Sequence, residues 1–170
     1  MPSGAERPRL FWAIAALWVA ADLATKALIE SRFDPSRVKP VVGDWVQLRL
    51  VYNPGAAFGL DLGPHSRWIF LVIALVALAV LWRMARVTPV ADRFRHIALG
   101  LVAGGAAGNL VDRVRSPQGV VDFLDLGIGA MRWPTFNVAD IGVSCGAVAL
   151  AISLWLEDAR RARSQTTAAP

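Results

Sequence analysis

Four long apolar segments divide the chain, and they constrain its fold more than any other feature. They run from Leu10 to Ile29, from Trp68 to Trp82, from Ile97 to Val111 and from Val138 to Leu156. The first is 20 residues long, about the length that a helix needs to cross the hydrocarbon core of a bilayer. Tryptophan and arginine residues flank the shorter segments and extend them to the membrane interface. We therefore predict one integral membrane domain, residues 1–170, with spans at about 10–29, 67–84, 96–112 and 138–156.

The composition excludes an ordinary soluble domain. Of 170 residues, 55% are hydrophobic and 18% are charged, which is too apolar for a soluble chain of this size. The net charge of +5 does not indicate nucleic acid, because the arginines flank apolar segments instead of forming one basic stripe. We expect no nucleic-acid partner.

The arginine distribution predicts the orientation in the membrane. Four spans place both termini on one side, and the arginines concentrate on that side: Arg7, Arg9, Arg83, Arg86, Arg93, Arg95, Arg160, Arg161 and Arg163. Short cytoplasmic segments carry an excess of positive charge. We therefore expect cytoplasmic termini, and residues 30–66 and 114–135 on the external side.

The first external connection contains a strand pattern. From Trp45 to Tyr52, apolar residues alternate with more polar ones, as in a strand with one apolar face. Asn53-Pro54-Gly55 follows with residues typical of a turn. This pattern predicts a small β element on the membrane surface.

A polar stretch, residues 104–140, joins the last two apolar segments and places Asp122 and Asp140 beside the membrane surface. Carboxylates in such a position are functional candidates. Two carboxylates within hydrogen-bonding distance share a proton, because both do not easily ionise together. One would then activate water and the other would protonate a leaving amine, as in an aspartyl hydrolase. The residues do not assign these two roles, because the titration belongs to the pair.

The same residues also have structural interpretations. Asn137 is a good helix N-cap, and an acid at Asp140 suits the positive end of a helix, so capping alone is the simpler explanation of these two. Asp22 and Lys26 are four residues apart and share a helix face. They form either a purely structural ion pair or a brace for a catalytic centre.

Other catalytic chemistries have weaker support. His65 and His96 fall on opposite sides of the membrane in this topology, which argues against a Ser-His-Asp centre. Lys26 and Ser144 each lie about one turn from the outer end of a helix and leave a Ser–Lys centre open, although a helical serine more often bonds its own backbone. Cys145 is the only cysteine, and no cluster has metal-ligand spacing. We expect neither a metal nor another cofactor.

Five short motifs occur in order along the chain. They are Asp22-Leu-Ala-Thr-Lys26, Asn53-Pro-Gly-Ala-Ala-Phe58, Gly105-Ala-Ala-Gly-Asn109-Leu-Val-Asp-Arg113, Val120-Val-Asp122-Phe and Phe136-Asn-Val-Ala-Asp140. Together they resemble the motifs of the lipoprotein signal peptidases, also called signal peptidase II. The resemblance implies an all-α membrane protein with four transmembrane helices and a small periplasmic β cradle. It further implies an aspartyl endopeptidase of the bacterial inner membrane, which cleaves prolipoproteins just before their diacylglyceryl-modified cysteine.

The resemblance also implies roles for individual residues. Asp122 and Asp140 match the catalytic dyad. Eight further residues match positions that bind substrate or support the site: Asp22, Lys26, Asn53, Gly105, Asn109, Arg113, Asn137 and Ala139. The implied partners are diacylglyceryl-modified prolipoproteins and membrane lipids, and the implied active site faces the periplasm.

Two departures from the family pattern stand out. Residues 115–119 make the connection before Asp122 about one residue longer than usual, and Gly59 stands where a serine is common. The longer connection leaves the path of residues 114–121 open and keeps Asp125 as a second candidate for the role of Asp122. From the residues alone, a proton-coupled transporter and a non-catalytic membrane scaffold remain as alternatives. Transport is disfavoured, because the polar residues concentrate near one membrane face.

Overall fold

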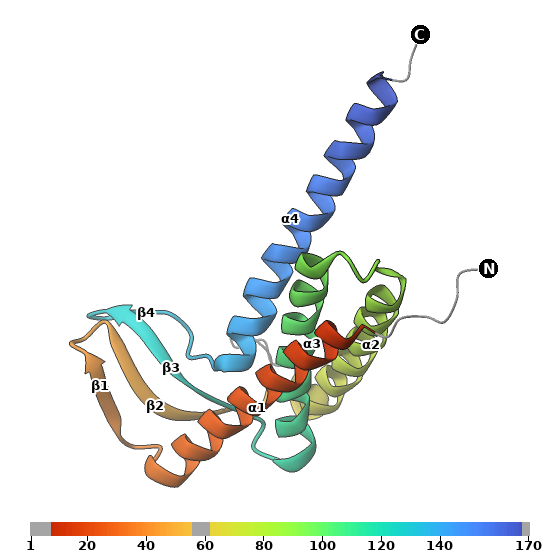
Figure 1. Cartoon of the computed structure of the whole chain (residues 1–170). Coiled ribbons are helices and arrows are strands. Elements are labelled where there is room, and N and C mark those ends of the chain that lie inside the picture. The colour runs from red at the N-terminus through yellow and green to blue at the C-terminus, as the bar shows by residue number, and fades with distance from the viewer. Residues whose placement is uncertain (1–7, 56–61, 168–170) are drawn as a thin grey trace.

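The computed structural model describes residues 8–55 and 62–167. Within these ranges, four helices, a four-stranded sheet and one short 3-10 turn follow one another (Figure 1). In order they are α1 (Arg9–Arg32), β1 (Val38–Val42), β2 (Val46–Asn53), η2 (Gly63–His65), α2 (Ser66–Val87), α3 (Arg93–Arg115), β3 (Val120–Ile128), β4 (Met131–Arg132) and α4 (Val138–Thr167). All four helices contain a stretch that is long and apolar enough to cross a membrane. The predicted mostly helical membrane fold is confirmed.

The helices are longer than the predicted spans. Each begins or ends within charged flanks, as α1 does at Arg9 and Arg32, and α4 extends for 30 residues, well beyond the other helices in Figure 1. Backbone hydrogen bonding continues past the apolar stretch, because charged side chains in the last turn still favour a helix. The membrane boundaries themselves stay a prediction.

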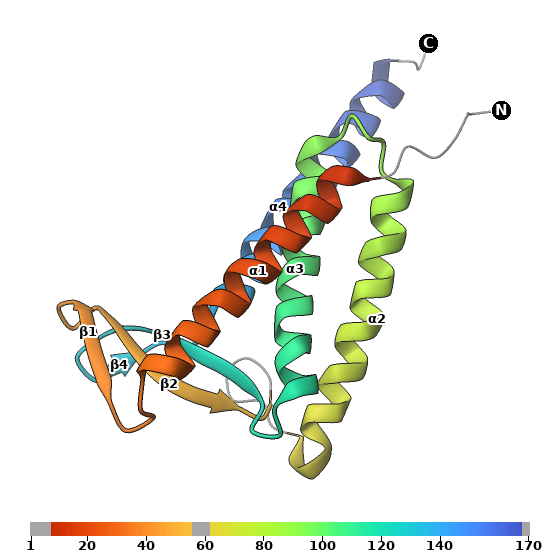
Figure 2. The same cartoon turned by 60° about the horizontal axis from the view of Figure 1, so that its bottom comes forward.

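Helix α3 lies at the centre of the bundle, where α1, α2 and α4 all pack against it (Figure 2). Glycines on its faces permit this close packing. A Cβ atom added to Gly104 would lie 2.8 Å from the carbonyl oxygen of Ala15 in α1. One added to Gly105 would overlap the carbonyl oxygen of Ala139 in α4. The small residues of α3 therefore set how near α1 and α4 each approach α3.

The strands form one antiparallel sheet in the order β1-β2-β3-β4 at one end of the bundle. In β2, Leu50 is buried against Ile29 of α1 and against Val121 and Phe123 of β3. The predicted apolar face of the strand is thereby confirmed. Strands β1 and β3 were not predicted, since their segments appeared in the sequence as polar connections.

The connection from α3 to β3 is a tight turn of residues 116–119. Gly119 adopts a φ of +102°, which favours glycine. It lies against the Asn53–Pro54 backbone, where an added Cβ atom would come within 2.7 Å of the Cα atom of Pro54. The turn therefore places β3 beside β2 and aligns Val120 with Asn53.

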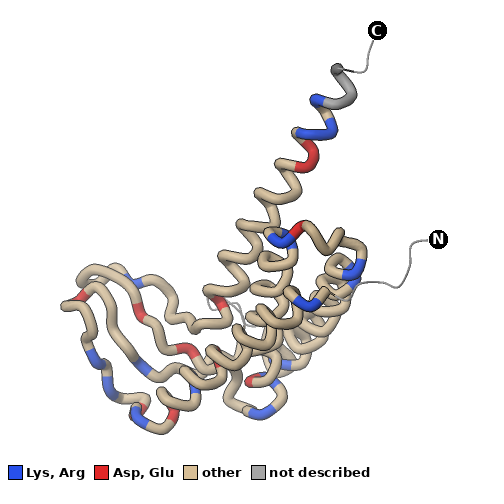
Figure 3. The backbone as a smooth tube through the Cα atoms, viewed as in Figure 1, with Lys and Arg blue, Asp and Glu red and all other residues tan. Residues whose placement is uncertain are grey.

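Arginines with few acidic neighbours gather at the end of the bundle where α1 and α3 begin and α2 ends (Figure 3). This end holds Arg9 of α1, Arg83 and Arg86 of α2, and the start of α3. The sheet lies at the opposite end. The end that carries the sheet also has Lys and Arg residues, but Asp and Glu residues are interspersed among them (Figure 3). The excess of positive charge therefore lies at the other, arginine-rich end.

Candidate functional site

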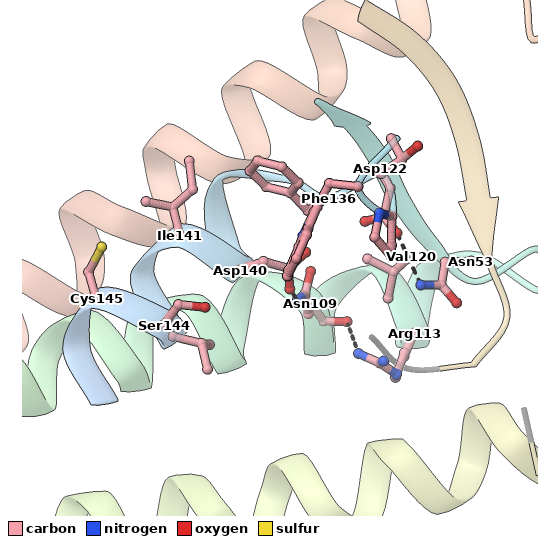
Figure 4. Close-up of a pocket in the computed structure, with 14 residues that line it drawn as sticks. Asn53, Asn109, Arg113, Val120, Asp122, Phe136, Asp140, Ile141, Ser144 and Cys145 are labelled. Carbon is pink, nitrogen blue, oxygen red and sulfur yellow. Dashed lines mark hydrogen bonds between the residues drawn. The ribbon is translucent and has the colours of Figure 1, made fainter. Parts of the chain in front are cut away.

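A pocket of about 400 Å³ opens where the start of α4 meets β3 and the final turns of α3. Polar side chains from four elements line it (Figure 4). They are Asn53 from β2, Asn109 and Arg113 from α3, Asp122 from β3, and Asp140 from α4. The rest of the lining is largely apolar and includes residues 141 and 143–145 of α4.

Asn137 connects the two carboxylates. Its amide Nδ2 donates to Asp122 Oδ1 at 2.7 Å. Its Oδ1 accepts from the backbone N–H of Asp140 at 2.9 Å, and its own backbone N–H donates to Asp140 Oδ2 at 3.2 Å. These two reciprocal hydrogen bonds between Asn137 and Asp140 form an N-terminal cap of α4. The capping interpretation is therefore correct, and the same cap also holds Asp140 beside Asp122.

Two further side-chain amides also donate hydrogen bonds to these carboxylates. Asn53 Nδ2 donates to Asp122 Oδ2 at 3.0 Å, and Asn109 Nδ2 donates to Asp140 Oδ1 at 2.8 Å. Each carboxylate oxygen thus accepts an amide N–H. Within residues 8–55 and 62–163, neither carboxylate forms a salt bridge. The negative charge is held in place without being neutralised by a contacting cation.

The surroundings of Asp122 disfavour its charged form. Burial, followed by the nearby charge of Asp140, raises the pKa of Asp122 to about 7. The hydrogen bonds from Asn53 and Asn137 and the charge of Lys26 oppose this rise but do not cancel it. Near neutral pH the pair therefore readily holds one proton, the state in which one carboxyl group acts as an acid and the other as a base.

Lys26 lies behind the pocket and is fully buried. Its Nζ is 2.9 Å from Asn109 Oδ1, and 2.7 Å from a carboxylate oxygen of Asp22 and of Asp112. These three contacts use all three donors of the ammonium group. They orient the Asn109 amide toward Asp140 and leave Lys26 without a donor for Ser144. This arrangement argues against the Ser–Lys centre.

Asp22 and Asp112 tie the helices to the backbone beside the two pocket carboxylates. Asp22 Oδ1 accepts from the N–H of Ala139 at 2.8 Å, next to Asp140. Asp112 Oδ2 accepts from the N–H of Val121 at 3.2 Å, next to Asp122. Each of these buried acids therefore fixes the position of one pocket aspartate.

Gly105 and Ala139 account for the close approach of α3 to α4 at this depth. Ala139 is fully buried, and its carbonyl oxygen occupies the space that a Cβ atom on Gly105 would need. A larger residue at either position would push the start of α4 away from α3. Because Asp140 follows Ala139 directly, the small residues place it within reach of Asn109.

Arg113 connects the end of α3 to the turn after β2. Its guanidinium donates to the carbonyl oxygens of Asn109 at 3.2 Å and Gly55 at 2.9 Å. It also lies over the ring of Phe70, 5.7 Å from the ring centroid. The remainder of the motif that begins at Asn53, including Phe58 and the neighbouring Gly59, lies outside the described residues.

Residues 14–156 match the family model described as signal peptidase (SPase) II. The chain belongs to the signal peptidase II family. A lipoprotein signal peptidase from Rhodococcus jostii (strain RHA1) is 41% identical over 164 residues, which cover 89% of this chain and 79% of the relative. One from Cupriavidus taiwanensis is 40% identical and covers 95% of this chain and 89% of the relative.

A solved structure titled as a bacterial membrane enzyme has the same fold as this signal peptidase II chain. It superposes with a TM-score of 0.78 at 29% identity, covering 87% of this chain and 88% of that one. A second such structure gives a TM-score of 0.73 at 30% identity. The chain is therefore a multi-pass membrane protease of a bacterial, aspartic-type family.

The structure brings together all ten residues that the signal peptidase II resemblance singled out. Five of them line the pocket, and Asp22, Lys26, Gly105, Asn137 and Ala139 support it from behind. Asp112 was missed, although it lies within the third motif. Its position in that motif was the available signal, but its contacts with Lys26 and Val121 depend on the fold.

The remaining candidates lie apart from the pocket. Asp125 is paired with Arg132 at 3.0 Å and with Arg49 at 3.6 Å, within the sheet, and it does not line the pocket. His65 directly precedes α2 and His96 lies in the first turn of α3, and these two helices begin at opposite ends of the bundle (Figure 2). Among the described residues, no group of three or more His, Cys, Asp or Glu side chains could hold a metal ion.

Proposed function

We propose that this chain is an aspartyl endopeptidase that removes signal peptides from prolipoproteins, cleaving before the diacylglyceryl-modified cysteine, with Asp122 and Asp140 as its catalytic dyad. The observation that carries the proposal is that Asn137 contacts both carboxylates in one pocket, Asp122 through its side-chain amide and Asp140 through its backbone N–H. The names of the matched relatives support the substrate class.

The reaction needs one proton shared by two carboxyl groups. The ionised carboxylate takes a proton from water as the water oxygen attacks the scissile carbonyl carbon, and the protonated carboxyl group donates to the carbonyl oxygen. Collapse of the tetrahedral intermediate then breaks the C–N bond, and a proton passes to the leaving nitrogen. The products are the carboxylate of the signal peptide and the free amine of the modified cysteine.

The raised pKa of Asp122 supports this residue as the one that carries the proton near neutral pH. Asp140, which is only partly buried, then serves as the base. The guanidinium of Arg113 lines the same pocket and would offset the negative charge that develops on the carbonyl oxygen.

Replacing either aspartate tests the dyad. Asp122→Asn and Asp140→Asn should each reduce cleavage of a purified, lipidated prolipoprotein by at least about 10²-fold, the usual contribution of one acid–base group. Both variants should insert and fold as the wild type does. Retained activity in either, or loss only with Ser144→Ala and Lys26→Ala, would move the reaction to a Ser–Lys centre.

The lipid on the substrate would set the depth of the scissile bond. Each buried methylene contributes about 0.8 kcal/mol, so a diacylglyceryl group holds the modified cysteine at the interface, where the pocket opens at the end of the helices. Anchoring places the peptide bond beside the dyad without a three-dimensional search. A prolipoprotein whose modified cysteine is replaced by serine should be cleaved far more slowly. Equal rates would show that the enzyme does not recognise the lipid.

The separation of the arginine-rich end from the sheet supports cytoplasmic termini and a periplasmic active site. In a Cys145→Ser background, Gln118→Cys should react with a membrane-impermeant reagent in intact cells, because residue 118 lies in the turn beside the sheet. Val90→Cys, between α2 and α3, should not react. The reverse pattern would invert the topology and separate the dyad from a periplasmic substrate.

A further inference from the structure

A second cavity lies on the opposite side of α3 from the dyad pocket. It is an apolar groove of about 600 Å³ between α1 and α2, with Ala103 and Ala107 of α3 as its floor. Both outer helices pack on α3, and at one end the rings of Trp12 and Trp82 bridge them with centroids 5.1 Å apart. Away from these rings the α1 wall consists mainly of alanines, which are too small to fill the space.

The groove has the depth of one membrane leaflet. Its α1 wall extends from Phe11 to Leu23, which corresponds to about 18 Å at a rise of 1.5 Å per residue. This is close to half of a hydrocarbon core about 30 Å thick. The dimension suits an extended acyl chain of one leaflet and is short for a helix that crosses the whole membrane.

The mouth of the groove is positively charged on both walls. Trp12 is preceded one turn earlier by Arg9, and Trp82 is followed one turn later by Arg86, whose guanidinium lies 5.6 Å from the Trp82 ring centroid. Arg83 lies at the same end of α2. All three arginines are exposed, and within residues 8–55 and 62–163 no acid forms a salt bridge with them. A phosphate at this mouth would meet unneutralised cations from both helices.

The geometry points to a binding site for an anionic phospholipid, with an acyl chain between α1 and α2 and the phosphate at Arg9 and Arg86. Tryptophan and arginine at the same depth are typical of the lipid headgroup region. The ligand enters from the leaflet at the arginine-rich end, whereas the dyad pocket opens at the other end of the bundle. The site is therefore distinct from the one that takes the substrate.

Lipid retention tests this site directly. The full-length protein is reconstituted in vesicles of equal parts phosphatidylglycerol and phosphatidylcholine, extracted in mild detergent and examined by native mass spectrometry. We expect one phosphatidylglycerol to be retained, in at least roughly tenfold excess over phosphatidylcholine, because basic side chains at the surface attract anionic lipid. Equal retention of both lipids would overturn the charge-based assignment.

Two double variants separate the mouth from the groove. Arg9→Gln/Arg86→Gln should bring retention of the two lipids close to parity, while Arg32→Gln/Arg37→Gln removes the same charge at the far end of α1 and should change nothing. Ala16→Leu/Ala20→Leu fills the groove from the exposed wall of α1 and should abolish retention. Ala13→Leu/Ala24→Leu is its control, since neither residue lines the groove.

Retention that survives both test pairs would overturn the proposal. So would a change in oligomer mass on filling the groove, because the groove would then be an interface with a second copy of the chain. A rise in thermal stability on adding phosphatidylglycerol, present in the wild type and absent in Ala16→Leu/Ala20→Leu, would support the site by an independent measurement.

Discussion

Asp22 and Asp112 are buried as deeply as Asp122, but their partners differ in kind. Asp22 and Asp112 each lie 2.7 Å from the ammonium group of Lys26, and Asp112 also pairs with Arg115 at 2.8 Å. The dyad of Asp122 and Asp140 contacts only amide groups among the described residues. One pair of acids is neutralised by contact, and the other is merely held in position.

In the proposed mechanism, this difference in partners separates the supporting acids, Asp22 and Asp112, from the reactive ones, Asp122 and Asp140. A buried carboxylate that contacts a cation has its charge compensated by that contact and forms a rigid anchor. A buried carboxylate held by neutral amides keeps its geometry while its charged form remains costly, which is why the pKa of Asp122 rises to about 7. The molecule thus uses the same side chain for two purposes and distinguishes them by the partners that surround it.

Replacing Lys26, the cation that Asp22 and Asp112 share, should have the largest effect on stability. Lys26→Met leaves Asp22 and Asp112 facing each other without compensation and should cost roughly 3–5 kcal/mol of unfolding free energy. Thermal or denaturant unfolding in detergent measures the loss. Lys39→Met replaces an exposed lysine of β1 and should leave stability within about 0.5 kcal/mol. Similar losses of unfolding free energy in Lys26→Met and Lys39→Met would show that contact with Lys26 does not distinguish Asp22 and Asp112 from Asp122 and Asp140.

Above neutral pH, Asp122→Asn should stabilise the folded chain, whereas Lys26→Met should destabilise it. Because the pKa of about 7 in the folded chain exceeds the ordinary aspartate pKa of 3.8, the folded chain binds a proton that the unfolded chain has released. Wild-type stability therefore falls as pH rises from about 4 to about 7. The variant lacks this slope and should be more stable than the wild type by about 1–3 kcal/mol at pH 8. The unfolding free energies of both proteins, measured at pH 5 and pH 8, test this prediction. A variant whose stability falls between these pH values as much as that of the wild type would contradict it.

The pH dependence of cleavage should shift when an amide that donates to Asp122 is removed. Activity of the singly protonated dyad should be lost as pH rises through about 7, the pKa of Asp122. Asn53→Ala removes a hydrogen bond that lowers this pKa, so the alkaline limb of kcat/KM should shift to higher pH. Gln47→Ala, on the same strand but bonded to Asp44, provides the control. An unshifted limb in Asn53→Ala would mean that Asp122 does not set the alkaline limb.

Asp125→Asn should have the smallest effect on catalysis. Its carboxylate pairs with Arg132 and Arg49 in the sheet, away from the pocket lining. Cleavage should stay within about threefold of wild type, with a stability loss of about 1 kcal/mol or less for a partly exposed ion pair. A loss as large as that of Asp122→Asn would return Asp125 to the role given to Asp122.

The helices and β2 were predictable because their signals are local, whereas the supporting residues came from the family resemblance. An apolar segment of helical length has few alternatives in a membrane, and the alternation from Trp45 to Tyr52 predicted β2. Strand β1 is exposed along its whole length and contains Pro40, so it shows no apolar periodicity. Strand β3 is buried on both faces from Val120 to Phe123, which hides the period of two.

Asp112 illustrates the same limit within the site. The sequence showed that Gly105, Asn109 and Arg113 recur every four residues and share one face of α3. Asp112 is three residues after Asn109 and lies to one side of that face. Its partners, Lys26 and Val121, belong to α1 and β3. Only the packing of three elements reveals that it positions the strand of Asp122.

The amide groups around the dyad also determine where its protons go. Lys26 donates to Asn109, and Asn109 donates to Asp140, so a continuous line of hydrogen bonds leads from a buried cation to the reactive pair. Such a line transmits polarisation, but an amide N–H does not release its proton at neutral pH. The dyad is therefore insulated from the ionisable groups behind it. In the proposed reaction, every proton consumed or released would therefore pass through the open pocket, carried by water or by the substrate itself.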